Sequence, residues 1–251
     1  MKAVYENGYA KMKRIKNHPR LMKTLNVARG LFKPNDKLKV LDIGCGDGLF
    51  AIELGKVLHT KSLYGTDISN KAVTLSNKNN VETYLIDTDK NKLPFKSGYF
   101  DLVFCGSVIE IVDNPDKLLI ELNRVVKKKG YVIVTFPNHS AWLSRIAVLF
   151  GYLPFYYRLS TKFELGKMFG TTQKGNSSGF IRLFNSNSFK ILAQKYGFEN
   201  IKITGSQENA LPRFLKPLDT ILSKRPSLAF QVIVLMTKKN KSNYENTIQS
   251  M

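Results

Sequence analysis

The chain has 251 residues, of which 43% are hydrophobic, enough for one α/β domain with appendages and a sizeable core. No apolar stretch reaches the length of about eighteen residues that a membrane-spanning helix needs, and the Lys/Arg-rich N-terminal segment lacks the apolar part of a secretory signal. Cys45 and Cys105 are too few for a disulfide framework or a metal-ligand cluster, so we expect a cytoplasmic protein without a bound metal.

The net charge is +20, from 39 Lys and Arg against 19 Asp and Glu. Such an imbalance favours contact with an anionic partner, which can be nucleic acid, a membrane surface or an anionic substrate. Charge alone does not choose among these partners. A solvated basic surface without a specific partner stays equally open.

Residues 1–33 are expected to form two helices that are broken at Asn17, His18 and Pro19, because proline suits the first turn of a helix. The second helix has an apolar face, and its opposite face is basic. The apolar face comprises Leu21, Met22, Leu25, Ala28, Leu31 and Phe32, and the basic residues are Lys11, Lys13, Arg14, Lys16, Arg20, Lys23 and Arg29. We expect residues 1–35 to be a helical cap that faces the substrate or a membrane. The alternative is a docking helix whose basic side is simply solvated.

The segment from Val40 to Gly48 predicts a buried strand at residues 39–43, a turn with glycines at alternate positions, and a helix at residues 49–58. Glycines in such a turn let the backbone approach a ligand closely. The dinucleotide fingerprint G-x-G-x-x-G would need a third glycine where Leu49 stands. Asp42 and Asp47 would also repel a pyrophosphate, so a cationic ligand suits this turn better.

At these residues the sequence resembles the class I S-adenosylmethionine-dependent methyltransferases, whose first motif has the form hhD-h-G-x-G-x-G. The resemblance is to the type 11, or ubiquinone-type small-molecule, branch. It implies a Rossmann-like α/β fold: a seven-stranded, mostly parallel sheet with helices on both faces and an antiparallel last strand. It also implies S-adenosyl-L-methionine as cofactor, with Asp42, Gly44, Cys45 and Gly46 at its site.

Two further strands are predicted to end in acidic residues. Asp67 ends a strand at residues 62–67, where it can accept hydrogen bonds from both hydroxyls of a ribose, with Ile68 beside it. A purely structural Asp67 that caps the next helix is the alternative. Asp87 and Thr88 follow a strand at residues 82–86, and the resemblance assigns them to the adenine ring.

Residues 98–105 lead into a fourth predicted strand, which Asp101 begins in a structural role. The resemblance places Cys105, Gly106 and Ser107 around the sulfonium and the site of methyl transfer. Many related small-molecule enzymes have Glu-His just beyond this strand, whereas this chain has Glu110 followed by Ile111. A histidine base or metal ligand is therefore absent at that place, and Glu110 is a weak candidate catalytic residue.

Residues 115–127 predict a helix that residues 127–130 (Lys-Lys-Lys-Gly) close, since cations and glycine are favoured at a helix C-terminus. A fifth strand follows at residues 131–136. His139, just past this strand, is the best candidate for a general base. Substrate positioning or a local hydrogen bond in the turn is the alternative role for His139.

Residues 139–184 form an insertion rich in aromatic and aliphatic side chains, with a long polar loop at residues 166–179 that suggests a lid. Its apolar content favours a hydrophobic substrate or a surface that lies on a membrane, with a satellite core as the equal alternative. Helices are expected at residues 186–196 and 213–223, and strands at 198–204 and 228–237. Residues 36–237 would be the methyltransferase domain and residues 238–251 a disordered tail.

The sequence therefore predicts a methyltransferase that acts on an oxygen or nitrogen of a small-molecule, lipid or glycan-precursor acceptor, free in the cytoplasm or peripheral to a membrane. An RNA methyltransferase is the first alternative, favoured by charge alone. A catalytically inactive protein that binds the cofactor is the second. The sequence does not indicate an oligomeric state.

Overall fold

The computed structural model describes residues 18–33, 37–157, 168, 180–209 and 211–239. In chain order its elements are α2 (Pro19–Arg29), β1 (Lys39–Ile43), α3 (Leu49–Leu58), β2 (Ser62–Asp67), α4 (Asn70–Lys78), β3 (Glu82–Leu85), β4 (Phe100–Gly106), α5 (Pro115–Val125), β5 (Val126–Pro137), α6 (Trp142–Leu149), α7 (Ser186–Lys195), β6 (Phe198–Ser206), η3 (Arg213–Leu215), α8 (Lys216–Leu222) and β7 (Gln231–Lys238).

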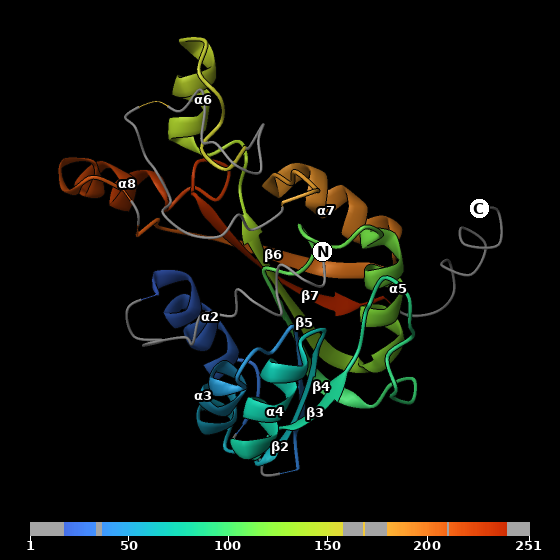
Figure 1. Cartoon of the computed structure of the whole chain (residues 1–251). Coiled ribbons are helices and arrows are strands. Elements are labelled where there is room, and N and C mark those ends of the chain that lie inside the picture. Colours follow the sequence, from blue (N-terminus) through green and yellow to red (C-terminus); the bar gives the residue numbers. More distant parts are fainter. Residues whose placement is uncertain (1–17, 34–36, 158–167, 169–179, 210, 240–251) are drawn as a thin grey trace.

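The strands form one seven-stranded sheet in the order β3-β2-β1-β4-β5-β7-β6 (Figure 1). β1 to β5 pair in parallel, and β7 runs antiparallel to both of its neighbours, β5 and β6. The sheet order reverses between β1 and β4, which leaves their carboxyl ends at a topological switch point where ligands of open α/β sheets bind. The predicted fold class is confirmed.

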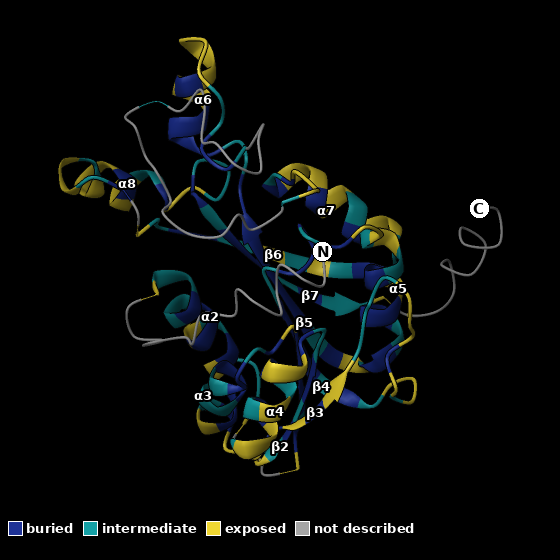
Figure 2. Cartoon of the chain, viewed as in Figure 1, coloured by how far each residue is buried: buried dark blue, intermediate teal, exposed yellow. Residues whose placement is uncertain are grey.

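Successive residues of the central strands point to opposite faces of the sheet and so contribute to two separate cores. Val40, Leu102 and Ile133 pack with the apolar sides of α2 and α3. Leu41 and Val103 pack on the other face with α5 and α7. Figure 2 shows the central strands coloured as buried between helices whose outer sides are exposed.

Helix α2 is part of the sheet's own core and does not merely cover it. Leu21, Leu25 and Ala28 are buried in the cluster that also contains residues of α3 and β1. Residues 1–17 of the expected cap lie outside the described residues. The second predicted helix is therefore confirmed as far as it is described, and it is anchored where it can place side chains over the sheet.

Residues 127–130 do not cap α5, so that prediction is wrong. The helix ends at Val125 and β5 begins at Val126, with an irregular register against β4. Lys127 Nζ lies 2.8 Å from both carboxylate oxygens of Asp101. A Cβ on Gly130 would lie 2.9 Å from the carbonyl oxygen of Asp101, so glycine lets the two backbones approach. Strand pairing and this ion pair outweigh the local preference for a helix end.

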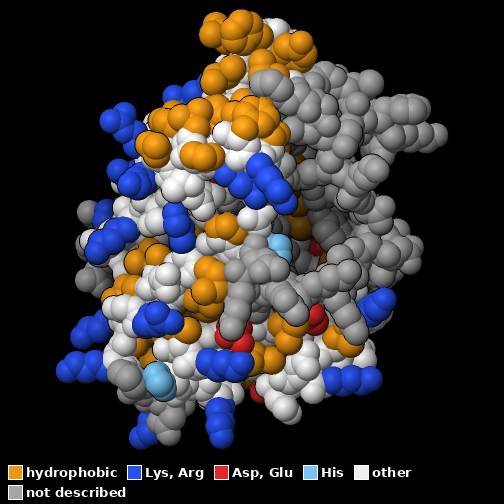
Figure 3. Space-filling model, turned by 90° about the vertical axis from the view of Figure 1, so that its left-hand side faces the viewer, with side chains coloured by type: hydrophobic (Ala, Val, Ile, Leu, Met, Phe, Trp, Pro, Cys, Tyr) orange, Lys and Arg blue, Asp and Glu red, His pale blue; other side chains and the backbone are white. Residues whose placement is uncertain are grey.

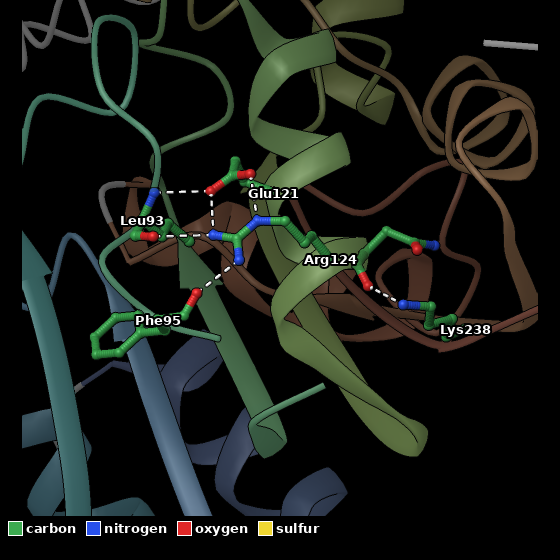
Figure 4. A network of polar contacts seen from close by, with 6 residues as sticks. Leu93, Phe95, Glu121, Arg124 and Lys238 are labelled. Atoms are coloured by element: carbon green, nitrogen blue, oxygen red, sulfur yellow. Dashed lines mark hydrogen bonds and ion pairs between the residues drawn. The ribbon is translucent and has the colours of Figure 1, made fainter. Parts of the chain in front are cut away.

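A polar network holds the segment between β3 and β4 against α5 (Figure 4). Arg124 donates to the carbonyl oxygens of Leu93 at 2.9 Å and Phe95 at 2.6 Å, and pairs with Glu121 at 2.6 Å. Glu121 in turn accepts from the Leu93 N–H at 2.7 Å. Burial opposes ionisation of Glu121, but the hydrogen bonds and charge of Arg124 lower its pKa overall. The network fixes one end of the segment that begins at the carboxyl end of β3.

The C-terminal elements differ from the prediction in their bounds. The helix expected at residues 213–223 is divided into η3 and α8, where Pro217 stands in the first turn of α8. β7 extends to Lys238, whose Nζ donates to Asn123 O at 2.6 Å, so Lys238 belongs to the sheet and not to a tail. Residues 240–251 lie outside the described residues.

The part of the insertion that is described forms a third core beyond the sheet. Trp142, Phe155 and Tyr156 pack with Leu211 and Phe230. Trp142 Nε1 donates to Asp219 Oδ1 at 3.0 Å and so joins α6 to α8. The predicted lid loop lies outside the described residues, except for Met168, which packs against this third core.

Candidate functional site

The turn after β1 is held by backbone hydrogen bonds, and its backbone conformation and close contacts favour glycine. Gly44 N–H and Cys45 N–H both donate to Thr66 O, at 2.7 and 3.1 Å. Gly44 and Gly48 have φ angles of 70° and 76°, in the left-handed region that favours glycine. A Cβ on Gly48 would lie 2.5 Å from Ser76 Oγ, and one on Gly44 would lie 2.5 Å from a methyl carbon of Val108.

Asp67 connects this turn to the end of β2. Its Oδ2 accepts from the Gly46 N–H and its Oδ1 from the Ser69 N–H, both at 2.9 Å. Burial raises the pKa of Asp67, while hydrogen bonds from the backbone of Ser69, Gly46 and Ile68 oppose that rise. The carboxylate is therefore fixed in place, and each of its oxygens has a further lone pair for a ligand hydroxyl.

A cavity of about 410 Å³ lies at the carboxyl ends of β1, β2, β3 and β4, within the size range of small-molecule sites. It is lined by Ile43, Gly44, Gly46, Thr66, Asp67, Ile68, Ser69, Ile86, Asp87, Thr88, Asp89, Lys90, Gly106, Ser107, Val108, Ile111, Val112 and Asp113. Eight of the predicted cofactor residues are among them: Gly44, Gly46, Asp67, Ile68, Asp87, Thr88, Gly106 and Ser107.

Three predicted cofactor residues do not line this cavity. The Asp42 side chain is buried below it, and burial, together with the charges of Asp67 and Asp47, raises its pKa well above the usual value. Cys45 Sγ contacts Ser76 Oγ at 3.7 Å and Thr83 Oγ1 at 3.9 Å. Cys105 is buried in the sheet core. Their side chains support the turn and the strand beneath the cavity.

The charges around the cavity fit a ligand that donates hydrogen bonds or carries a positive charge. Among the described residues that line it, Asp67, Asp87, Asp89 and Asp113 are acidic and Lys90 is basic. Lys90 Nζ lies 3.5 Å from Asp87 Oδ2, which neutralises part of its charge. A pyrophosphate would face an excess of carboxylates, whereas ribose hydroxyls, an adenine amino group and a sulfonium would be favoured.

One wall of the cavity leads to a second group of polar residues. Ser107 has a φ of 57°, uncommon for a residue with a side chain, and its N–H donates to Thr135 O at 2.9 Å. Its Oγ accepts a hydrogen bond from Arg20 Nη1 of α2. Arg20 was predicted only as one member of a basic helix face, and no local signal in the sequence distinguishes it from the other cations.

Glu110, the weaker candidate catalytic residue, lies beside this contact and is 1% exposed. Neither of its carboxylate oxygens makes a well-formed hydrogen bond with another described residue. Burial raises the pKa of Glu110 to about 7, although the backbone N–H of Glu110 itself, the nearby Arg20 charge and the Ser107 hydroxyl oppose the rise. A buried carboxylate of this kind is able to exchange a proton near neutral pH.

His139, the stronger candidate, has mainly aromatic neighbours. Its ring centroid lies 5.9 Å from that of Tyr156 and 6.4 Å from that of Phe180. Its backbone N–H donates to Phe184 O at 3.0 Å. His139 is not among the residues that line the cavity, so its catalytic role stays a prediction.

Comparison with known proteins agrees with this geometry. Residues 41–134 match the methyltransferase-domain family. The chain is 33% identical over 100 residues to a malonyl-[acyl-carrier protein] O-methyltransferase of Legionella pneumophila, covering 39% of this chain and 35% of that protein. It is 30% identical over 146 residues to a ubiquinone biosynthesis O-methyltransferase of Rickettsia prowazekii, covering 54% of this chain and 52% of the relative. The chain thus spans about half or less of the length of these relatives.

Among solved structures, a methyltransferase of Thermotoga maritima, described as S-adenosylmethionine-dependent and a possible histamine N-methyltransferase, superposes with a TM-score of 0.64. The alignment covers 94% of this chain and 99% of that one at 21% identity, which supports the fold alone. Residues 41–134 therefore resemble the methyltransferase-domain family, and the overall fold is the Rossmann-like fold seen in class I S-adenosylmethionine-dependent methyltransferases.

Proposed function

We propose that this protein is a methyltransferase that uses S-adenosyl-L-methionine to methylate an oxygen or nitrogen of a small-molecule or lipid-like acceptor. The observation that carries the proposal is the acid-rich cavity at the ends of β1 to β4, which combines the glycine turn with Asp67 and Asp87. S-adenosylmethionine, when bound, supplies an electrophilic methyl group. Asp67 would hold the ribose hydroxyls, Asp87 and Thr88 would hold the adenine, and Ser107 would lie toward the acceptor.

The role of the remaining chain is mainly to orient the acceptor. Correct alignment of the reacting atoms can lower the activation barrier by about 7–11 kcal/mol. The names of the two relatives, both O-methyltransferases of small molecules or carrier-bound groups, support a small-molecule acceptor. Isothermal titration calorimetry with S-adenosylmethionine, NAD and ATP tests the cofactor. We expect binding of S-adenosylmethionine only, and binding of NAD or ATP in its place would overturn the proposal.

A second measurement separates an enzyme from an inactive cofactor-binding protein. Incubation with methyl-labelled S-adenosylmethionine and separate lipid, small-molecule and RNA fractions of a cell extract should label the lipid or small-molecule fraction. Cofactor binding without label in any fraction would favour the inactive alternative. Label confined to RNA, with binding that weakens steeply as salt rises, would favour the RNA alternative.

We further propose that the protein contacts a membrane that carries anionic lipids, through an apolar tip formed by Val148, Leu149, Phe150, Tyr152, Phe214, Leu218 and Ile221. Leu149 is 80% exposed, Phe214 70% and Phe150 66%. Hydrophobic side chains gather over α6 and α8 in Figure 3, with lysines and arginines near them. Within the described residues no helix is long and apolar enough to cross a membrane, so the contact would be peripheral.

The charges on these elements support an anionic bilayer as the partner of the apolar tip. The exposed basic residues near it are Arg145, Arg213, Lys216, Lys224 and Arg225. Asp219, the acidic residue of α8, is buried and bound to Trp142. Apolar side chains that enter the lipid interface and cations that meet anionic headgroups act together in peripheral binding.

Sedimentation with phosphatidylglycerol-containing vesicles tests this surface. The wild type should bind these vesicles more strongly than phosphatidylcholine vesicles, and the double variant Leu149→Glu and Phe214→Glu should lose binding. Ile191→Glu is the matched control, because Ile191 is 59% exposed on α7, outside the apolar tip. Equal binding by the double variant and the control would reject the apolar tip as the membrane contact.

A further inference from the structure

Buried oxygen atoms without partners gather along one edge of the sheet. Among the described residues they include both carboxylate oxygens of Glu110, the hydroxyls of Thr135 and Ser206, and Oε1 of Gln231. Strand pairing brings these residues together, because Gly106 at the end of β4 pairs with Thr135, and Gln231 pairs with both Pro137 and Ser206. Buried polar atoms normally have partners, so this group lacks hydrogen-bond donors.

Helix α2 covers the same edge and carries a cation into it. Thr135 and Gln231 project to the sheet face on which Ile133 and Ile233 meet α2, since side chains alternate along a strand. Lys23 Nζ donates to Gly205 O at 2.8 Å, which places α2 against the end of β6. Arg20 donates to Ser107 Oγ, and burial lowers the pKa of Arg20 against the opposing influence of Glu110, Tyr156 and Glu208.

The second carboxylate near Arg20, that of Glu208, is held by a network. The Tyr156 hydroxyl donates to Glu208 Oε2, and Gln231 Nε2 lies 2.8 Å from the Tyr156 oxygen and 3.2 Å from Glu208 Oε2. The Glu208 N–H donates to Asp219 Oδ2 at 3.0 Å. Residues from α2, the insertion, β7 and the segment after β6 thus converge on one place beyond Ser107.

We name this group the acceptor chamber: Arg20, Ser107, Glu110, Tyr156, Glu208 and Gln231. It contains two carboxylates and one guanidinium, and its unpartnered atoms are the carboxylate oxygens of Glu110 and the amide oxygen of Gln231. Carboxylate and amide oxygens only accept hydrogen bonds. A ligand that supplies hydroxyl or ammonium donors satisfies these atoms, whereas a phosphate or carboxylate would face Glu110 and Glu208.

We propose that the acceptor chamber binds the reacting end of the methyl acceptor, that this end is a hydroxyl or ammonium group, and that Glu110 takes its proton. This inference rests on the proposed function. The O–H or N–H bond of the acceptor breaks, and the proton passes to the Glu110 carboxylate. The freed lone pair of the acceptor forms the new bond to the methyl carbon, and the sulfur keeps the electron pair of the broken S–C bond as a neutral thioether.

A buried carboxylate whose hydrogen bonds are left incomplete until a substrate binds should lower the stability of the free protein. Folding raises the pKa of Glu110 from 4.5 to about 7, so its ionisation opposes folding. The loss of folding stability caused by this ionisation grows as pH rises from 4.5 to about 7 and is complete above pH 7. Glu110→Gln removes the charge and keeps the shape. We therefore expect the variant to unfold at a higher temperature than the wild type at pH 8, and the difference to shrink toward pH 5.

The test combines thermal unfolding between pH 5 and pH 9, calorimetric affinity for S-adenosylmethionine, and transfer of labelled methyl groups to the fraction that the wild type labels. Glu110→Gln should lower methyl transfer by at least ~100-fold, the usual contribution of a general base. Its cofactor affinity should stay within about twofold of the wild type, since Glu110 does not line the cofactor cavity. Glu53→Gln is the control, because Glu53 lies on the surface of α3 and pairs with Lys56.

Each of the other outcomes rejects a specific part of this proposal. Lower stability of Glu110→Gln than wild type at every pH would assign Glu110 a structural role. Retained transfer with raised stability would reject it as the proton acceptor. Absence of cofactor binding and transfer in the wild type would reject the proposed function, and with it the acceptor chamber, whatever the unfolding data show about Glu110.

Discussion

The guanidinium of Arg20 donates a hydrogen bond to the hydroxyl of Ser107, which joins helix α2 to the end of β4 across 87 positions of sequence. Ser107 lines the cavity, and Glu110 lies close enough for Arg20 and Ser107 to lower its pKa. The Arg20 side chain thereby places a positive charge where the cavity proposed for the methyl donor meets the acceptor chamber. Its removal should change the chemistry of the acceptor chamber more than the stability of the fold.

Arg20→Gln should shift the pH dependence of methyl transfer upward. The charge of Arg20 opposes the rise in the pKa of Glu110 that burial causes, so this pKa rises further without it. Because the ionised carboxylate is the active form of a base, activity should appear only at higher pH. Rates measured from pH 5 to pH 9 check this, with Arg29→Gln at the exposed end of α2 as control. An unchanged midpoint would show that Arg20 does not act on the base.

Asp67→Ala should reduce the affinity for S-adenosylmethionine by at least ~100-fold, because two hydrogen bonds to a charged group are lost at about 1.5–3 kcal/mol each. Calorimetry measures the affinity, and circular dichroism shows whether the variant folds, since Asp67 also holds the Gly46 and Ser69 backbones. Asp116→Ala, at an exposed position in α5, is the control. Unchanged affinity in Asp67→Ala would remove Asp67 from the cofactor site.

His139→Ala should lower methyl transfer by less than ~10-fold and leave cofactor affinity unchanged, if Glu110 is the base. The ring of His139 lies against Tyr156 and Phe180, so its loss should mainly loosen the wall near the acceptor. His18→Ala, at the exposed start of α2, is the control. A loss as large as that of Glu110→Gln would transfer the role of base to His139.

Three glycine-to-alanine changes should separate backbone strain from steric clash. Gly30→Ala should be nearly neutral, because Gly30 has a φ of −87° and no atom within 4 Å of a new Cβ. Gly98→Ala should cost about 1–2 kcal/mol from its φ of 65° alone. Gly48→Ala adds contact with Ser76 and Val81, which raises the cost by about 1–3 kcal/mol. Equal unfolding midpoints in urea for Gly98→Ala and Gly48→Ala would show that the turn relaxes.

Local patterns were sufficient to predict the strands and the helix that surround the cavity at the carboxyl ends of β1 and β2. The strands at Lys39–Ile43 and Ser62–Asp67 and the helix at Leu49–Leu58 have the predicted bounds. The acids at the strand ends meet because parallel strands bring their carboxyl ends to one edge of the sheet. Composition and spacing over a few residues determine these elements, and the same few residues form most of the cavity wall.

Long-range contacts explain what the sequence did not reveal. Residues 127–130 have the composition of a helix end, but Lys127 pairs with Asp101, 26 positions earlier. Tyr156 meets Glu208 across 52 positions, and Arg20 meets Ser107 across 87. Such partners cannot be read from a short window, because any of the 39 cations could have filled the role of Arg20. The acceptor chamber is therefore visible only in the folded chain.

The position of α2 has a consequence for how relatives of this protein can be compared. The family match covers residues 41–134, which contain the glycine turn, Asp67 and Asp87. Arg20, Tyr156, Glu208 and Gln231 all lie outside that segment. Under the proposed function, inheritance of the shared segment can thus preserve binding of the methyl donor while the flanking segments diverge to new acceptors. Two proteins with the same matched segment should be grouped by acceptor only after their flanking residues have been aligned in three dimensions.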